Sequence, residues 1–260
     1  MGLVQELRIP NQPREGLKIA VIPDAQVMPG VPMDHLAAAG EYIVEKKADV
    51  IVCIGDFGDF PSLSRFERNT LMFEGRRYKK DLAAFHEGMQ HFLGPIEAAP
   101  DYDPVKVFTL GNHEDHIPRF VSENPILEEV ISLDDLCLEE YGWKVYPFLQ
   151  PVSINGVAFC HYFPSGVMGR PITSARAQLT KLHMSSVAGH QQGRDLAFSR
   201  RADGAHMTSV ITGSFYQHSY GYLSPFTNKH WRGMMMMHEV KDGMFDEMMV
   251  SIDYLKRRYG

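Results

Sequence analysis

Residues 50–59 read VIVCIGDFGD. The first five residues are an apolar run of the length of a buried strand. Gly55 and Asp56 follow the run at once, so an acid stands where the strand ends. The stretch therefore predicts a buried strand that delivers Asp56 to a loop.

Two further apolar runs end in the same way. Residues 17–22 (LKIAVI) stop at Pro23 and are followed by Asp24, and residues 105–110 (VKVFTL) are followed by Gly111, Asn112 and His113. Polar residues at three strand exits are typical of a functional site at one edge of a sheet.

Two helices are expected between these strands. Apolar residues recur at helical spacing over residues 33–47 and again over residues 82–92, where Gly94 and Pro95 are expected to close the helix. Strands that alternate with helices in this way predict a mostly parallel inner sheet whose C-terminal edge carries the site.

The second half of the chain has short apolar runs without helices between most of them. They predict a largely antiparallel sheet that faces the first one. The runs are residues 152–154, 157–160, 187–188, 196–199, 209–212, 234–240 and 248–252.

Length and composition indicate one globular domain. At 260 residues the chain fits a single domain, residues 1–260, with residues 1–16 as a lead-in and residues 57–80 as a lid or insert. The net charge of −6 argues against a general nucleic-acid coat, although a local basic groove remains compatible with it. Isolated cysteines and the lack of a long apolar stretch predict a cytoplasmic protein without a membrane partner.

Five separated segments place a metal-competent residue beside a glycine or at a strand end. Two divalent ions need one carboxylate between them and further nitrogen or oxygen ligands around each, and loops from one sheet edge are suited to supply these. The segments are Asp24-Ala-Gln26, Gly55-Asp56-Phe-Gly-Asp59, Gly111-Asn112-His113-Glu114, His161 and Gly189-His190-Gln-Gln192.

In this order the segments resemble the motifs of the calcineurin-like metallophosphoesterases. That family's pattern runs Asp-x-His, Gly-Asp-x-x-Asp, Gly-Asn-His-Asp/Glu, His and Gly-His-x-His, and the resemblance covers residues 17 to about 192. The chain is most similar to uncharacterised members of bacteriophages and prophages, which implies the host cytoplasm. The resemblance implies an α/β fold, a four-layer αββα sandwich of two mixed β-sheets with the metal site at the sheet edges.

The resemblance also implies roles for individual residues. Asp56 would bridge two ions and Asp24 would bind the first. The second ion would be completed by Asn112, His161 and His190. His113 would transfer a proton to the leaving group, and Asp59 would hold the other nitrogen of its ring.

Two residues depart from the family pattern at the first ion. Gln26 and Gln192 stand where the pattern has histidine. Oxygen ligands favour hard ions, so we expect two divalent metal ions, Mn²⁺ first, with Mg²⁺, Zn²⁺ or iron as alternatives. The other interpretation is that this site is weak, or fills when substrate phosphate adds ligands.

The function expected from these residues is a two-metal-dependent phosphoesterase that hydrolyses phosphodiesters. Aromatic and basic residues within residues 57–80 would suit a DNA nuclease, or would simply pack as a lid. The partner is thus a phosphate-ester substrate, with DNA as the candidate. The alternatives are a phosphatase or phosphodiesterase on small nucleotides, and a non-catalytic binding protein stabilised by metal.

Overall fold

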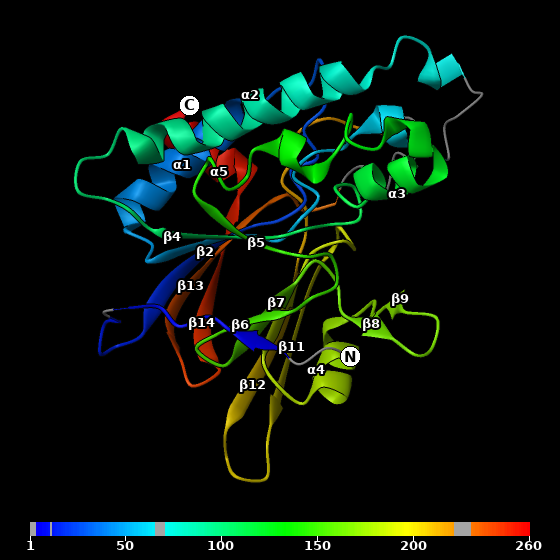
Figure 1. Cartoon of the computed structure of the whole chain (residues 1–260). Helices are drawn as coiled ribbons and strands as arrows, with labels where there is room; N and C mark the ends of the chain where they lie inside the picture. The colour runs from blue at the N-terminus through cyan, green and yellow to red at the C-terminus, as the bar shows by residue number, and fades with distance from the viewer. Residues whose placement is uncertain (1–3, 11, 66–70, 221–229) are drawn as a thin grey trace.

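Two six-stranded sheets pack face to face in the computed structural model, which describes residues 4–10, 12–65, 71–220 and 230–260 (Figure 1). Sheet I has the strand order β14-β13-β2-β3-β4-β5. Its strands are β2 (Leu17–Ile22), β3 (Val50–Cys53), β4 (Val105–Thr109), β5 (Trp143–Tyr146), β13 (Gly233–Lys241) and β14 (Met244–Ser251). The strands β2 to β5 are parallel, whereas β13 and β14 are each antiparallel to their neighbours.

Sheet II has the strand order β1-β6-β7-β10-β12-β11. Its strands are β1 (Gln5–Glu6), β6 (Val152–Ile154), β7 (Val157–Cys160), β10 (Ser186–Ala188), β11 (Arg194–Arg200) and β12 (His206–Thr212). The pairs β1·β6, β7·β10 and β10·β12 are parallel, and the other two pairs are antiparallel. A separate two-stranded ribbon joins β8 (Pro164–Ser165) to β9 (Arg170–Pro171).

Helices cover the outer face of each sheet, so the predicted four-layer αββα sandwich is confirmed. One apolar core lies between sheet I and the helices α1, α2 and α5, a second lies between the two sheets, and a third lies between sheet II and α4 (Figure 1). The α-helices are α1 (Asp34–Lys46), α2 (Tyr78–Glu97), α3 (His116–Glu123), α4 (Ala175–Leu182) and α5 (Ile252–Tyr259). In the described residues, short 3-10 helices span Pro61–Leu63, Leu71–Phe73, Pro125–Leu127 and Leu133–Leu136.

The prediction of a largely antiparallel second sheet is wrong in two respects. Three of its five strand pairs are parallel. The run at residues 234–240 and all but the last residue of the run at 248–252 belong to sheet I, while Ile252 begins α5. The reason is visible in β13, where Met234 and Met236 join the helix-side core while Met235 and Met237 join the core between the sheets. A run buried on both faces fits a central strand of either sheet, so it does not indicate which sheet the strand enters.

The helix expected to close at Gly94 and Pro95 instead continues to Glu97. Gly40 of α1 lies against this last turn, and a Cβ there would come within 2.5 Å of the Phe92 carbonyl oxygen and 3.2 Å of Pro95 Cγ. The close packing of α1 on α2 therefore holds a turn that proline alone would disfavour.

The predicted lead-in contributes to sheet II through β1, whose Gln5 pairs with Val152 of β6. None of the helices in the described part of the chain is long and apolar enough to cross a membrane.

Candidate metal centre

Strand ends from both sheets converge on one place. In sheet I, the chain leaves β2 towards Asp24, β3 towards Asp56 and β4 towards Asn112. In sheet II, His161 follows β7 directly and His190 follows β10 by two residues. Because β2, β3 and β4 are parallel neighbours, their exits share one edge, and the parallel pair β7·β10 brings its two histidines to the facing edge.

Two glycines allow the loops to approach the acids closely. A Cβ at Gly111 would lie 2.2 Å from Asp56 Oδ1, and a Cβ at Gly189 would lie 2.6 Å from Asp24 Oδ2. Both distances are well below van der Waals contact, so any side chain at these positions would displace an acid. The glycines that accompany the candidate ligands in the sequence therefore have a steric role.

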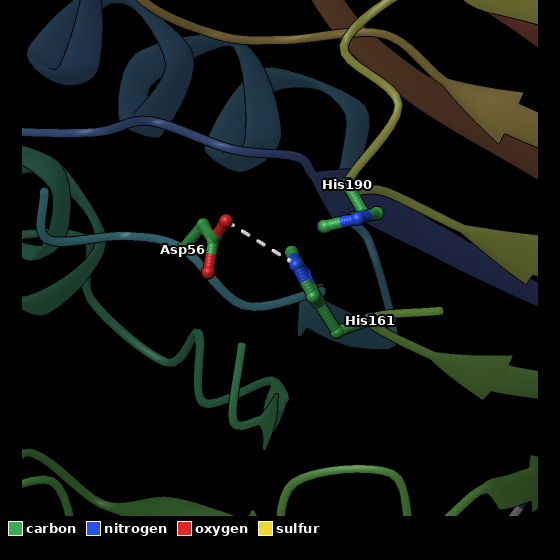
Figure 2. A group of neighbouring side chains, drawn as sticks. All are labelled: Asp56, His161 and His190. Carbon is green, nitrogen blue, oxygen red and sulfur yellow. Dashed lines mark ion pairs between the residues drawn. The ribbon is translucent and has the colours of Figure 1, made fainter. Parts of the chain in front are cut away.

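Asp56, Asn112, His161 and His190 form a group that we call the second metal position. One ligand atom from each of Asp56, His161 and His190 lies within 4.8 Å of the others (Figure 2). His161 Nε2 is 3.2 Å from Asp56 Oδ2 and 3.0 Å from Asn112 Oδ1, and His190 Nδ1 is 2.7 Å from the same amide oxygen. A carboxylate, two imidazoles and an amide oxygen form a donor set suited to a divalent transition ion.

The hydrogen-bond partners of His161 are compatible with a cation at this place. Its Nδ1 lies 2.9 Å from the Ile54 carbonyl oxygen, an acceptor, so Nδ1 carries a proton. In the neutral ring Nε2 then has a lone pair that faces two oxygens, Asp56 Oδ2 and Asn112 Oδ1. Either a second proton or a metal ion resolves this conflict, and a backbone carbonyl behind a metal-binding imidazole is the usual supporting contact.

The sequence predicts that Asp24, Gln26, Asp56 and Gln192 hold the first ion, and we call this group the first metal position. Asp24 is fully buried and its carboxylate accepts a hydrogen bond from the backbone N–H of His190, at 3.1 Å from each oxygen. The backbone N–H of Gln26 donates to the Asp56 carbonyl oxygen at 2.9 Å. The two glutamine amide oxygens accept hydrogen bonds from tyrosine hydroxyls, Gln26 from Tyr220 at 2.7 Å and Gln192 from Tyr216 at 2.8 Å.

Burial sets the electrostatics of the centre. Burial raises the pKa of Asp24 to about 7. The nearby Asp56 carboxylate also raises this pKa, whereas the His161 imidazole acts to lower it. Burial also acts to raise the pKa of Asp56, but the His161 and His113 imidazoles outweigh it and hold that pKa far below its usual range. Glu114 adds a third buried carboxylate. Burying several carboxylates close together costs free energy unless cations lie beside them. A metal centre would supply such cations.

His113 lies beside this group and contacts Asp59 through two atoms. Its Nδ1 is 2.6 Å from the Asp59 carbonyl oxygen and 3.2 Å from Asp59 Oδ1, and its Nε2 is 3.8 Å from Asp56 Oδ2. Burial acts to lower the pKa of His113, but the Asp56 and Asp59 carboxylates raise it to about 9. Both ring nitrogens are therefore protonated at neutral pH. Of the two, Nε2 lies on the side of Asp56.

Glu114 has a structural role that the sequence did not indicate. It is fully buried, and its carboxylate accepts hydrogen bonds from the backbone N–H groups of Asp56 at 2.9 Å, Gly58 at 3.2 Å and Gly111 at 2.8 Å. It thus joins the loop after β3 to the loop after β4. The only sequence feature that could have pointed to this role is the position of Glu114 as the fourth residue of the Gly-Asn-His-Glu segment.

Four of the candidate ligands have a left-handed backbone. The φ angles are 42° at Gln26, 52° at Asp56, 66° at His190 and 56° at Gln192. Residues other than glycine rarely adopt this conformation, and it persists where surrounding contacts enforce it, often at functional sites.

The segment at residues 57–80 only partly matches its sequence interpretation. Phe57 and Phe60 are buried and pack on Phe85, with ring centroids 5.4 and 5.7 Å apart, so they are not available to stack on nucleic-acid bases. Arg76 donates to the Pro61 carbonyl oxygen. Residues 66–70, with Phe66 and Arg68, lie outside the described residues.

Residues 215–220 reach the centre. The backbone N–H of Phe215 donates to the Asp24 carbonyl oxygen, and Tyr216 and Tyr220 supply the hydroxyls already described. Of the histidines without a sequence motif, His116 packs its ring 4.9 Å from that of His113, and His35 Nε2 contacts the Phe215 carbonyl oxygen at 2.8 Å.

Comparisons with known proteins find similar structures only. No protein-family model matches the chain, and no curated protein matches it. A dimetal phosphatase from Danio rerio is 11% identical over 91% of this chain and 99% of its own, with a TM-score of 0.44. A conserved uncharacterised protein from Streptococcus pneumoniae TIGR4, described as a predicted phosphoesterase, is 12% identical over 90% of this chain and 98% of its own, with a TM-score of 0.30.

Proposed function

We propose that this protein is a metal-dependent phosphoesterase that hydrolyses phosphodiesters. The observation that carries the proposal is the convergence of Asp56, Asn112, His161 and His190 on one buried point, where His161 Nε2 faces two oxygens. Asp24, Gln26 and Gln192 would hold another ion at the first metal position, and Asp56 would belong to both positions. When bound, divalent ions neutralise phosphoryl oxygens and lower the pKa of water.

The residues around the ions have distinct tasks in this proposal. Asp59 holds Nδ1 of His113 through its carbonyl oxygen and its carboxylate, which leaves the proton at Nε2 for the leaving-group oxygen. Asp56 accepts the backbone N–H of His113 at 2.9 Å, which fixes the ring beside the ligands. Glu114 keeps the two loops in register.

DNA is the substrate that we propose to test first, and a strand beside the centre supports it. β11 begins two residues after Gln192, and one of its faces exposes Arg194, Leu196, Phe198 and Arg200, with Phe198 59% exposed. The Arg194 guanidinium lies 5.0 Å from the Trp231 ring centroid. An exposed aromatic ring between two arginines is suited to bases and phosphates of a nucleic-acid strand, whereas a mononucleotide would not extend along it.

The proposal is tested with bis-p-nitrophenyl phosphate and Mn²⁺. We expect turnover that requires the ion and that is abolished in a folded Asp56→Asn variant, because an amide is a poorer bridging ligand than a carboxylate. Parallel assays with Mg²⁺, Zn²⁺ and Fe²⁺ establish the ion preference. Binding of ions without turnover under all four conditions would contradict the proposal and favour a non-catalytic binding protein.

The substrate class is resolved by a panel assayed under the best metal condition. Single-stranded DNA, double-stranded DNA, nucleotides and cyclic nucleotides are compared at equal phosphate concentration. We expect the highest kcat/KM on DNA. Preferential turnover of the small nucleotides would restrict the proposal to a phosphatase or phosphodiesterase of small molecules.

A further inference from the structure

Two buried tyrosines contact the two glutamines that replace histidine in the family pattern. The Tyr220 hydroxyl lies 2.7 Å from Gln26 Oε1, and the Tyr216 hydroxyl lies 2.8 Å from Gln192 Oε1. Tyr216 is 1% exposed and Tyr220 is 8% exposed, and their rings meet edge to face with centroids 5.5 Å apart. The two unusual residues of the first metal position thus share one type of partner from one short segment.

The surrounding structure holds the tyrosines in place. Next to Tyr216, the Phe215 N–H donates to the Asp24 carbonyl oxygen at 2.9 Å, which ties the segment to a candidate ligand. The Arg232 guanidinium lies 4.4 Å from the Tyr216 ring centroid and donates to the carbonyl oxygens of Tyr216 and His218 at 3.2 and 2.7 Å. Ring stacking and backbone contacts therefore both limit the movement of Tyr216.

The phenols act as donors in these contacts. Each hydroxyl lies within hydrogen-bond distance of an amide oxygen, which can only accept, so the hydroxyl donates its proton. An amide oxygen has two lone pairs, and one hydrogen bond leaves the other lone pair available to a cation. The left-handed backbone at Gln26 and Gln192 limits the directions that each side chain can take.

We propose that Tyr216 and Tyr220 are positioning residues of the first metal position: each hydroxyl holds a glutamine amide so that its oxygen remains available to a hard divalent ion. This inference rests on the proposed metal-dependent function. Metal-binding imidazoles are usually oriented by a hydrogen bond on the side away from the metal. The tyrosine hydroxyls would orient the glutamine amides in the same way. Both glutamines would then bind an ion through their amide oxygens, and the first metal position would be functional.

The test measures Mn²⁺ affinity of the full chain by titration calorimetry. The double variant Tyr216→Phe/Tyr220→Phe removes both hydroxyls and keeps both rings. We expect roughly 10- to 100-fold weaker binding at the first position, the usual effect of removing a group that orients a ligand, with unchanged binding at the second. Gln26→Ala identifies which binding step belongs to the first position.

Two controls separate positioning from general stability. Tyr42→Phe removes another buried hydroxyl, on α1, for which the described residues offer no hydrogen-bond partner, and it should leave both binding steps unchanged. Tyr220→Phe alone should weaken the first step in the wild-type chain and have no further effect in the Gln26→Ala background. The single variant also keeps the test usable if the double variant does not fold.

The outcomes divide clearly. First-position affinity that is unchanged or tighter in the tyrosine variants would overturn the inference, and so would an equal loss at both positions. In either case the proposed function stands as long as the wild type binds ions and hydrolyses bis-p-nitrophenyl phosphate. A wild type that binds no divalent ion would overturn both proposals.

Discussion

Glu114 connects two loops of the centre through three backbone hydrogen bonds. Its donors belong to Asp56, Gly58 and Gly111, so one carboxylate organises the candidate bridging ligand and the glycine that lies against it. Burial raises the pKa of Glu114, with the Asp56 carboxylate acting in the same direction. The backbone N–H groups around the carboxylate oppose this cost.

Removing this carboxylate should destabilise the protein. Glu114→Ala leaves three buried N–H groups without an acceptor, and each such group costs about 1–3 kcal/mol. We expect the free energy of unfolding to fall by about 3 kcal/mol or more, measured by urea denaturation of metal-free protein. Glu139→Ala, at an exposed glutamate, is the matched control. A change below about 1 kcal/mol would show that water or loop movement satisfies these groups.

His113 should be needed for turnover but not for metal retention. It contacts Asp56 and Asp59 and is not part of either metal position as defined above. His113→Ala should lower kcat by roughly 10²- to 10⁴-fold, the usual range for a general acid, while elemental analysis shows the same metal content. The loss should be largest for substrates with a poor leaving group. Equal rates on such substrates would exclude His113 from proton transfer.

At the scale of elements, β11 is the edge strand of sheet II and begins next to the centre. One face of β11 packs on α4, where the Asp195 carboxylate accepts a hydrogen bond from the backbone N–H of Ala175 at 2.8 Å. The residues on the other face are exposed. Seven residues of strand span about 20 Å, enough for a few nucleotides. We therefore expect contacts with β11 to contribute to kcat/KM on DNA but not on small substrates.

A double change on this strand tests that difference. Phe198→Ala/Arg200→Glu removes an exposed ring and reverses a charge, and base stacking alone is worth about 1–3 kcal/mol. We expect kcat/KM on DNA to fall roughly tenfold or more, with hydrolysis of bis-p-nitrophenyl phosphate unchanged. Tyr254→Ala/Arg257→Glu makes the same kind of change on α5 and should affect neither substrate. Equal losses on both substrates would indicate damage to the centre instead.

At the scale of the whole molecule, the candidate centre joins the two sheets. Asp24, Asp56 and Asn112 follow strands of sheet I, and His161 and His190 follow strands of sheet II. An ion held by residues from both sheets binds the folded chain and not the unfolded one. Metal binding and the stability of the sandwich should therefore be linked.

Chelation should lower the melting temperature for this reason. An ion at 100 times its Kd adds about 2.7 kcal/mol, and for a chain of this size each kcal/mol shifts Tm by about 2–4 °C. Mn²⁺ should thus raise Tm by roughly 5–10 °C over protein treated with EDTA, measured by differential scanning calorimetry. Asp56→Asn should lose most of this shift. Identical Tm values with and without the ion would contradict a metal centre between the sheets.

The local sequence predicts the strands that lead to the centre. An apolar run that ends in a polar residue is a local pattern, and β2, β3 and β4 follow it, leading to Asp24, Asp56 and Asn112. The resemblance to the metallophosphoesterases, carried by the same local segments, implied the four-layer sandwich before its topology was known. Nearest-neighbour chemistry sufficed for the strands and their exits because the end of each strand places its own polar residue.

Features that depend on residues far apart in the chain are visible only in the folded structure. Strand direction in sheet II, the addition of β13 and β14 to sheet I and the last turn of α2 are set by packing that apolar periodicity does not encode. The hydrogen bond from Tyr220 to Gln26 spans 194 residues. No local pattern indicates such a pair, because its energy exists only once the folded chain has brought the two side chains together and excluded water from them.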